Sequence, residues 1–115
     1  MAELNISVRQ AGDVTILDLG GKVTIGEGSI ALRTAVRNLI AEGKTKVLLN
    51  MSDISYCDSS GIGELVSSFS AIQREGGSMK LLNLTKKLKE LMSITKLLTV
   101  FDNFEDEETA LASFN

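Results

Sequence analysis

Histidine and tryptophan are absent from this chain of 115 residues, and cysteine occurs once. Without histidine the chain lacks the usual general base, the commonest metal ligand and any phosphohistidine relay. The sequence also lacks a Gly-x-Ser-x-Gly elbow and a Gly-x4-Gly-Lys-Ser/Thr phosphate loop. We therefore expect a protein that is not an enzyme, with no catalytic residue, no metal site, no cofactor and no small-molecule substrate.

Long apolar runs are missing as well. None approaches the roughly 18 to 20 residues that a helix needs to cross a bilayer, and the chain carries Glu3 where a targeting peptide would begin with a basic region. The lone Cys57 has no partner for an internal disulfide, which suits a reducing compartment. Its apolar setting favours a small core residue over a reactive thiol. These features predict a cytoplasmic protein with no membrane span.

An excess of positive charge is absent too. The 12 basic and 15 acidic residues give a formal net charge of -3, whereas nucleic-acid binding normally requires a basic surface. Direct binding to DNA or RNA is therefore not expected. The hydrophobic content of 43% and the charged content of 23% are ordinary for a globular protein. A chain of this length holds one core, so residues 1–115 are expected to form a single domain.

The spacing of apolar residues predicts the elements in the first half of the chain. Alternation over 4–8 and 14–19, around a turn at 11–13, indicates a hairpin. A helical period follows over 29–42, and the apolar run 47–51 is typical of a strand covered on both faces. We expect that run to lie in the centre of a sheet.

The second half alternates helices and strands in a similar way. Apolar residues at helical spacing run over 62–72 and stop at two glycines, and a strand over 79–84 and another helix follow. A brief strand at 99–101 and a final helix from about 104, capped by Asn103, complete the pattern. Single helices between strands imply right-handed crossovers. The expected fold class is α/β, with one mixed, mostly parallel sheet of four to five strands, about four helices and an opening β-hairpin.

The most informative feature is the junction between an extended apolar stretch and a helix, occupied by Asp58, Ser59, Ser60, Gly61, Ile62 and Gly63. A helix start presents unpaired N–H groups and partial positive charge, so a phosphate on serine would be stabilised there. The same acidic and hydroxyl residues also make good helix caps. Two glycines in one helical turn cost about 1 kcal/mol each relative to alanine, and they allow close approach of other groups. Physical chemistry alone leaves both readings open, a structural cap or a phosphorylation switch.

The segment Ile54-Ser55-Tyr56-Cys57-Asp58-Ser59-Ser60-Gly61-Ile62-Gly63 resembles that of anti-sigma factor antagonists, the single-domain bacterial proteins of the STAS family. The resemblance extends more loosely over nearly the whole chain and implies one STAS domain. In that family the unmodified protein binds an anti-sigma factor that is also a serine kinase and so frees the sigma factor. It is then phosphorylated and released, and a PP2C-type phosphatase resets it. The family phosphoserine corresponds to Ser59 here, with Ser60 as the alternative.

The resemblance also indicates which residues would contact the partner. They are Lys22, Val23, Thr24, Asp58, Ser59, Ser60, Gly61, Ile62 and Gly63. Many relatives carry an acidic residue where this chain has Thr24, so the identity of the partner does not transfer directly. The lysines at 86, 87 and 89 oppose the dipole of the helix that they begin, and they either face an acidic partner or are simply solvated.

Two other functions stay open at this stage. STAS domains also serve, without being phosphorylated, as scaffold subunits of stress-sensing assemblies or lipid-transport complexes, and the size of the particle in solution would discriminate that class. The glycine-rich loop 20–29 invites comparison with phosphate-cradling loops, which would indicate a nucleotide-binding or hydrolytic domain. It lacks the fixed spacing of either nucleotide fingerprint, and a flexible surface loop beside the serine junction is the alternative.

Overall fold

The computed structural model describes residues 3–114, and these form one five-stranded sheet in the order β1-β2-β3-β4-β5. The strands are β1 (Leu4–Ala11), β2 (Val14–Val23), β3 (Lys46–Cys57), β4 (Ser78–Leu82) and β5 (Asn103–Phe104). β1 pairs with β2 in antiparallel fashion, and the other neighbouring strands pair in parallel. The predicted α/β fold, with one mixed sheet and an opening hairpin, is confirmed.

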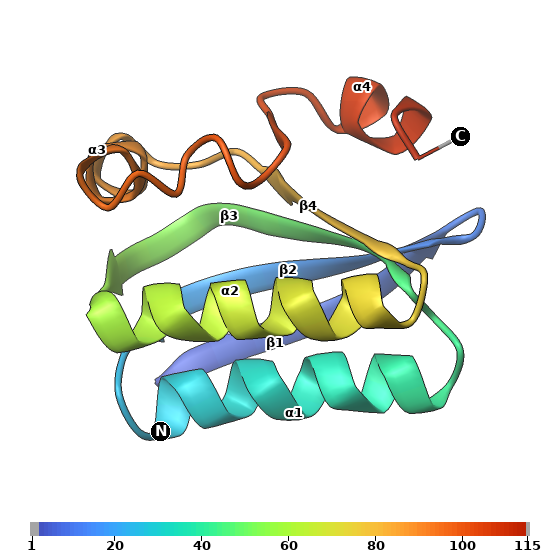
Figure 1. The fold of residues 1–115 in the computed structure, drawn as a ribbon, viewed down its shortest axis with the longest axis horizontal. Coiled ribbons are helices and arrows are strands. Elements are labelled where there is room, and N and C mark those ends of the chain that lie inside the picture. Colours follow the sequence, from blue (N-terminus) through green and yellow to red (C-terminus); the bar gives the residue numbers. More distant parts are fainter. Residues whose placement is uncertain (1–2, 115) are drawn as a thin grey trace.

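Within the described residues, four helices accompany the sheet: α1 (Glu27–Ala41), α2 (Ser59–Arg74), α3 (Lys86–Ile94) and α4 (Glu107–Ala112). α1 and α2 lie side by side along one face, whereas α4 packs on the opposite side (Figure 1). Between residues 3 and 114 the structure holds no helix with both the length and the apolar character needed to span a bilayer.

Strand β3 lies in the centre of the sheet and contributes side chains to two hydrophobic cores, because successive side chains of a strand point to opposite faces. Val47 and Leu49 are fully buried in the larger core, which α1, α2 and α3 cover. Leu48 points the other way, into a smaller core with Ala110 and Phe114 at the end of the chain. Burial on both faces explains why this run is nearly continuous in apolar residues.

The end of the chain differs from the prediction. Thr99 and Val100 lie in a turn, and the fifth strand is Asn103–Phe104, not 99–101. The apolar run 99–101 predicted a strand, but Phe101 is not buried by strand pairing. It is buried because its ring packs edge-on against that of Phe69, with ring centroids 5.0 Å apart.

The last helix begins later than predicted. Its N-cap is Asp106, whose carboxylate accepts a hydrogen bond from the Thr109 N–H at 2.9 Å, so Asn103 does not cap it. Asn103 instead belongs to β5, paired with Leu81. An extended chain there satisfies the edge of β4, which a helix starting at 104 would have left unpaired.

The parallel pairing of β2 with β3 creates the edge where the serine junction lies. Val23 and Cys57 are the last residues paired between the two strands. α1 follows β2 and α2 follows β3, so both helices begin at this edge. The carboxyl edge of a parallel sheet thereby collects two helix N-termini and the loops that lead into them.

Candidate functional site

Asp58 joins the two helix starts. As N-cap of α2, it accepts a hydrogen bond from the Gly61 N–H through Oδ1 at 2.8 Å. Its Oδ2 accepts from the Ile25 N–H, in the loop that leads to α1, at 3.1 Å. The hydrogen bond from Gly61, followed by that from Ile25, holds the pKa of Asp58 below its ordinary value. The carboxylate therefore stays charged at neutral pH and fixes the loop against the helix.

Two glycines allow the helices to start this close to β2. A Cβ on Gly61 would lie 2.0 Å from the Val23 carbonyl oxygen and 2.7 Å from the Cys57 Sγ. A Cβ on Gly28 would lie 2.4 Å from the Lys22 carbonyl oxygen. Gly63 differs, because among residues 3–114 no atom beyond its own stretch of helix comes within 4 Å of its Cβ position. Close approach, expected of both junction glycines, is thus a property of Gly61 alone.

Ser59 and Ser60 are the first two residues of α2, and both are exposed. Asp58 supplies the cap, and neither serine hydroxyl forms a hydrogen bond within residues 3–114. The capping interpretation therefore accounts for Asp58 and leaves both hydroxyls free for another role. Ser59 is not sealed in the core, which is a condition that the switch hypothesis has to meet.

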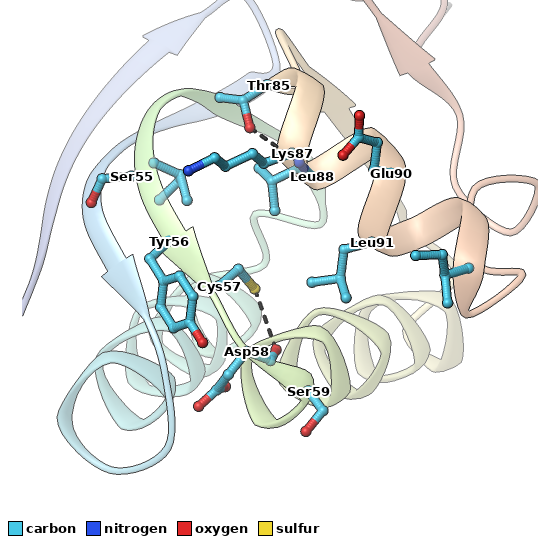
Figure 2. Close-up of a pocket in the computed structure, with 12 residues that line it drawn as sticks. Ser55, Tyr56, Cys57, Asp58, Ser59, Thr85, Lys87, Leu88, Glu90 and Leu91 are labelled. Atoms are coloured by element: carbon cyan, nitrogen blue, oxygen red, sulfur yellow. Dashed lines mark hydrogen bonds between the residues drawn. The ribbon is translucent and has the colours of Figure 1, made fainter.

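The two serines open onto different hollows. Ser59 lines a hollow of about 560 Å³ between the end of β3 and α3, which we call the β3–α3 groove (Figure 2). Its lining residues are Ile54, Ser55, Tyr56, Cys57, Asp58, Ser59, Thr85, Lys87, Leu88, Glu90, Leu91 and Ile94. Ser60 lines a second hollow of about 460 Å³ between α1 and α2, the α1–α2 groove. Adjacent positions on a helix point in different directions, so modification of one serine or the other would alter a different surface.

A polar contact crosses the α1–α2 groove. The guanidinium of Arg33, on α1, binds Glu64 of α2 with N–O distances of 2.9 Å. The Glu64 side chain is only 4% exposed, and its second oxygen accepts from the Ser68 hydroxyl at 3.3 Å. Arg33 therefore neutralises a buried carboxylate, which is a role within the fold.

The loop residues expected to contact a partner differ in exposure. Lys22 is exposed, Val23 is fully buried, and Thr24 is half-buried with its hydroxyl donated to the Glu3 carboxylate. The same carboxylate accepts from the Gly28 N–H at 3.1 Å, so Glu3 supplies the start of α1 with the acceptor that Gly26, its N-cap, lacks.

The remaining predicted residues support the site from beneath. Gly61 is buried within the first turn of α2, and Ile62 is 4% exposed in the larger core. Cys57 is buried as expected, and burial, followed by the charge of Asp58, raises the pKa of its thiol to about 12. The exposed members of the predicted set are Lys22, Ser59, Ser60 and Gly63, with Asp58 partly exposed.

Sequence reasoning missed the apolar side of the β3–α3 groove. Tyr56 is 56% exposed and Ile94 is 79% exposed, at the end of β3 and of α3 respectively. Leu91 is half-buried between them in the wall of the groove. Tyr56 is the next-to-last residue of β3 and Ile94 is the last residue of α3. The sequence around either residue gives no sign that the fold brings both to one hollow.

The lysines of α3 separate in the structure. Lys89 binds Glu105 at 2.7 Å, which gives it a partner within the fold. Lys86 and Lys87 are exposed, and Lys87 lines the β3–α3 groove. The start of α3 is capped by Thr85, whose hydroxyl accepts from the Leu88 N–H at 3.2 Å.

Comparison with known proteins gives consistent matches over most of the chain. The family model described as STAS domain matches residues 5–110. The anti-sigma-B factor antagonist of Bacillus subtilis (strain 168) is 29% identical over 99 residues, which cover 86% of this chain and 89% of that protein.

Solved structures share the fold. An anti-sigma factor antagonist from Mycobacterium paratuberculosis superposes with a TM-score of 0.85 at 15% identity, covering 96% of this chain and 93% of that one. The Bacillus cell fate determinant SpoIIAA in its phosphorylated form gives a TM-score of 0.74 at 18% identity, covering 96% and 100%.

Proposed function

The chain belongs to the STAS domain family, and we propose that it is an anti-sigma factor antagonist controlled by phosphorylation of Ser59. In this proposal the unphosphorylated protein binds an anti-sigma factor serine kinase in the cytoplasm and thereby releases the sigma factor. Phosphorylation by that kinase ends the complex, and a PP2C-type phosphatase restores the binding form. The protein itself is a binding module and a substrate, not an enzyme.

One observation supports the proposal: the Ser59 hydroxyl is exposed, and within residues 3–114 it forms no hydrogen bond, at the start of a helix that another residue already caps. A hydroxyl that served as the cap would have to break its hydrogen bond to the helix before it could enter a kinase active site. Because Asp58 fulfils that role, a phosphate can be added to Ser59 without loss of the cap. The neighbouring backbone N–H groups favour the added anion.

Phosphorylation would change the surface and leave the fold in place. A phosphoserine carries nearly two negative charges and three acceptor oxygens at neutral pH. Here they would be added directly beside the Asp58 carboxylate, which is charged at that pH. The helix start would then present concentrated negative charge to a docked partner, and any carboxylate or buried apolar group of that partner would oppose it.

In this proposal the part that each residue takes in the complex follows its exposure. The exposed residues Lys22, Ser59, Ser60 and Gly63 and the partly exposed Asp58 contact the partner. Val23, Gly61 and Ile62 support that surface from below, and Thr24 holds the loop through Glu3. We expect substitutions in the second group to act through stability and those in the first to act on binding.

The test incubates the full chain with ATP and each anti-sigma factor serine kinase of the same organism. Transfer is followed by mass spectrometry that maps the modified residue, and binding is measured by calorimetry. We expect phosphate on Ser59, tight binding by Ser59→Ala and weakened binding by Ser59→Asp, which carries one of the two charges. Ser78→Asp is the matched control, since Ser78 is an exposed serine at the opposite end of the sheet.

Three results would contradict the proposal. They are absence of transfer by every kinase, phosphate mapped outside the serine pair, and equally tight binding by the alanine and aspartate variants at position 59. Phosphate found on Ser60 would move the switch to the α1–α2 groove. Sedimentation of the native protein as part of a very large assembly, with no phosphate on it, would instead favour the scaffold class.

A further inference from the structure

We propose that the β3–α3 groove receives an apolar segment of the anti-sigma kinase, anchored on Tyr56, Leu91 and Ile94. This inference rests on the proposed function, and it extends the contact surface from the Asp58–Gly63 segment to the end of β3 and to α3. The occupant is a stretch of the kinase chain with apolar side chains that enter the groove. The phosphate on Ser59 would then act at the mouth of this groove.

The groove has the form of a docking site. Its floor is formed by buried residues of β3 and α3, among them Ile54 and Leu88. Figure 2 shows Leu91 projecting from α3 toward Cys57, with Tyr56 beyond Cys57. Tyr56 and Ile94 are more than half exposed, at 56% and 79%. Such apolar side chains around a hollow are typical of surfaces that another protein covers.

The position of Ser59 requires the kinase to lie over this region. A phosphoryl transfer needs the Ser59 hydroxyl inside the kinase active site, and Ser59 itself lines the groove. A stable interface buries about 800 Å² on each partner. The whole domain measures only 30 × 26 × 24 Å, so a surface of that size centred on Ser59 extends well beyond the first turn of α2.

The α1–α2 groove is the competing surface. It also carries exposed isoleucines, Ile25 and Ile30, but Ser29, Ser60 and Ser67 line it together with the Arg33–Glu64 ion pair. Covering those polar groups would require matching hydrogen bonds from the partner. The β3–α3 groove has polar lining residues too, but it adds the half-buried Leu91 to two exposed anchors, Tyr56 and Ile94.

The charge of Lys87 indicates how the kinase segment is oriented in the groove. Lys87 reaches from α3 across toward β3 in Figure 2, and it forms no ion pair with any residue from 3 to 114. A cation in the first turn of a helix opposes the helix dipole. Glu90 lines the same groove with the opposite charge, so we place an acidic residue of the kinase segment beside Lys87, away from Glu90, and the apolar residues of the segment nearer Ser59.

This arrangement gives phosphorylation a way to release the partner. An apolar segment seated beside Ser59 would have to share its surroundings with a dianion once the phosphate is attached. Keeping that dianion hydrated requires water where the segment lies, and burying it unpaired costs much free energy. The segment therefore leaves the groove while the groove itself is unchanged.

The chain provides a matched pair of variants for the test. Ile94 and Ile25 are isoleucines with exposed fractions of 79% and 75%, on opposite sides of the serine junction. Both are replaced by serine, and Val8, 59% exposed on β1, gives the remote control Val8→Ser. The probe is the purified kinase that phosphorylates the wild-type chain. Binding is measured by calorimetry, and the KM and kcat for phosphorylation of the chain are measured separately.

We expect Ile94→Ser to weaken binding by about ten-fold or more, the size typical of an anchor residue. The KM for the protein substrate should rise with little change in kcat, because the anchor does not touch the reacting atoms. Ile94→Met should retain binding, and Val8→Ser should match wild type. Wild-type affinity of Ile94→Ser would overturn the inference, whatever the Ile25→Ser result.

A second measurement does not depend on any substitution. The 15N-labelled chain is titrated with unlabelled kinase, and the amide signals that shift are assigned. We expect shifts at 54–59 and 87–94, and shifts confined to 25–33 and 60–67 would overturn the inference. The two failures are distinguishable: without binding or phosphorylation of the wild type both proposals fall, whereas a phosphorylated wild type with unaffected groove variants removes only the groove.

Discussion

Replacing Gly61 by alanine adds one methyl group at the most crowded point of the site. The new Cβ would lie 2.0 Å from the Val23 carbonyl oxygen, 2.7 Å from the Cys57 Sγ and 2.9 Å from the Val23 carbonyl carbon. Two of these three atoms belong to the backbone of β2, which is held in the sheet by β1 and β3. No rotation of a flexible side chain can relieve the contact, so α2 and β2 must move apart.

The change in the free energy of unfolding of Gly61→Ala is the sum of two opposing effects. The start of α2 would have to shift by roughly 1 Å to restore ordinary nonbonded distances. Forcing an extra methyl into a packed interior typically costs about 1–3 kcal/mol, and the cost lies at the upper end where backbone must move. Alanine gains about 1 kcal/mol over glycine in helix propensity. We therefore expect Gly61→Ala to lower the free energy of unfolding by about 2 kcal/mol.

Urea denaturation followed by circular dichroism measures this free energy, and the second glycine of the turn supplies the control. Gly63 is exposed and has nothing within 4 Å of its Cβ position, so Gly63→Ala should raise stability by up to about 1 kcal/mol. The two variants differ only in where one methyl lies. If Gly61→Ala proved as stable as Gly63→Ala, the close approach of α2 to β2 would be refuted.

Two further predictions concern ionisable groups of the site. Because the folded pKa of Asp58 lies below its unfolded value of about 3.9, its charge stabilises the fold fully above that pH and ceases to do so as pH falls through the folded pKa. The stability difference between wild type and Asp58→Asn should thus be constant from pH 7 to about 5 and shrink at pH 3, and a difference independent of pH would disprove it. Cys57, with its thiol pKa raised to about 12, should react with iodoacetamide at pH 8 at least about a hundred-fold more slowly in the native protein than in urea. Mass spectrometry follows the adduct, and equal rates in both states would show that the thiol is accessible.

Much of the fold could be predicted because its signals are local. Alternation over 4–8 and 14–19 predicts the hairpin, and the structure shows β1 and β2 there. The helix predicted over 29–42 is observed at Glu27–Ala41, and the one after the junction begins at Ser59. In each case the periodicity of apolar residues matches the face that the element buries.

The errors lie at the end of the chain, where packing and pairing compete. Phe101 is buried as a strand residue would be, but the N–H groups of Leu81 in β4 and of Asn83 just after it donate to the carbonyl oxygens of Asp102 and Phe104. Asn103 and Asp106 are equally good caps by residue type, and only the position of β5 decides between them. Local preference cannot resolve such a choice, because the competing contacts come from residues more than 15 positions away.

The sequence by itself determined the elements, the family resemblance and the presence of Asp58, Ser59 and Ser60 at a helix start. Which hollow each hydroxyl faces was decided only by the tertiary structure, since Ser59 borders α3 and Ser60 borders α1. The start of a helix can be predicted from sequence because capping and apolar periodicity depend on residues that are adjacent in the chain. The β3–α3 groove is different, because Tyr56 and Ile94 line it from two separate elements. The residues next to either one in the sequence do not indicate that the two lie near each other.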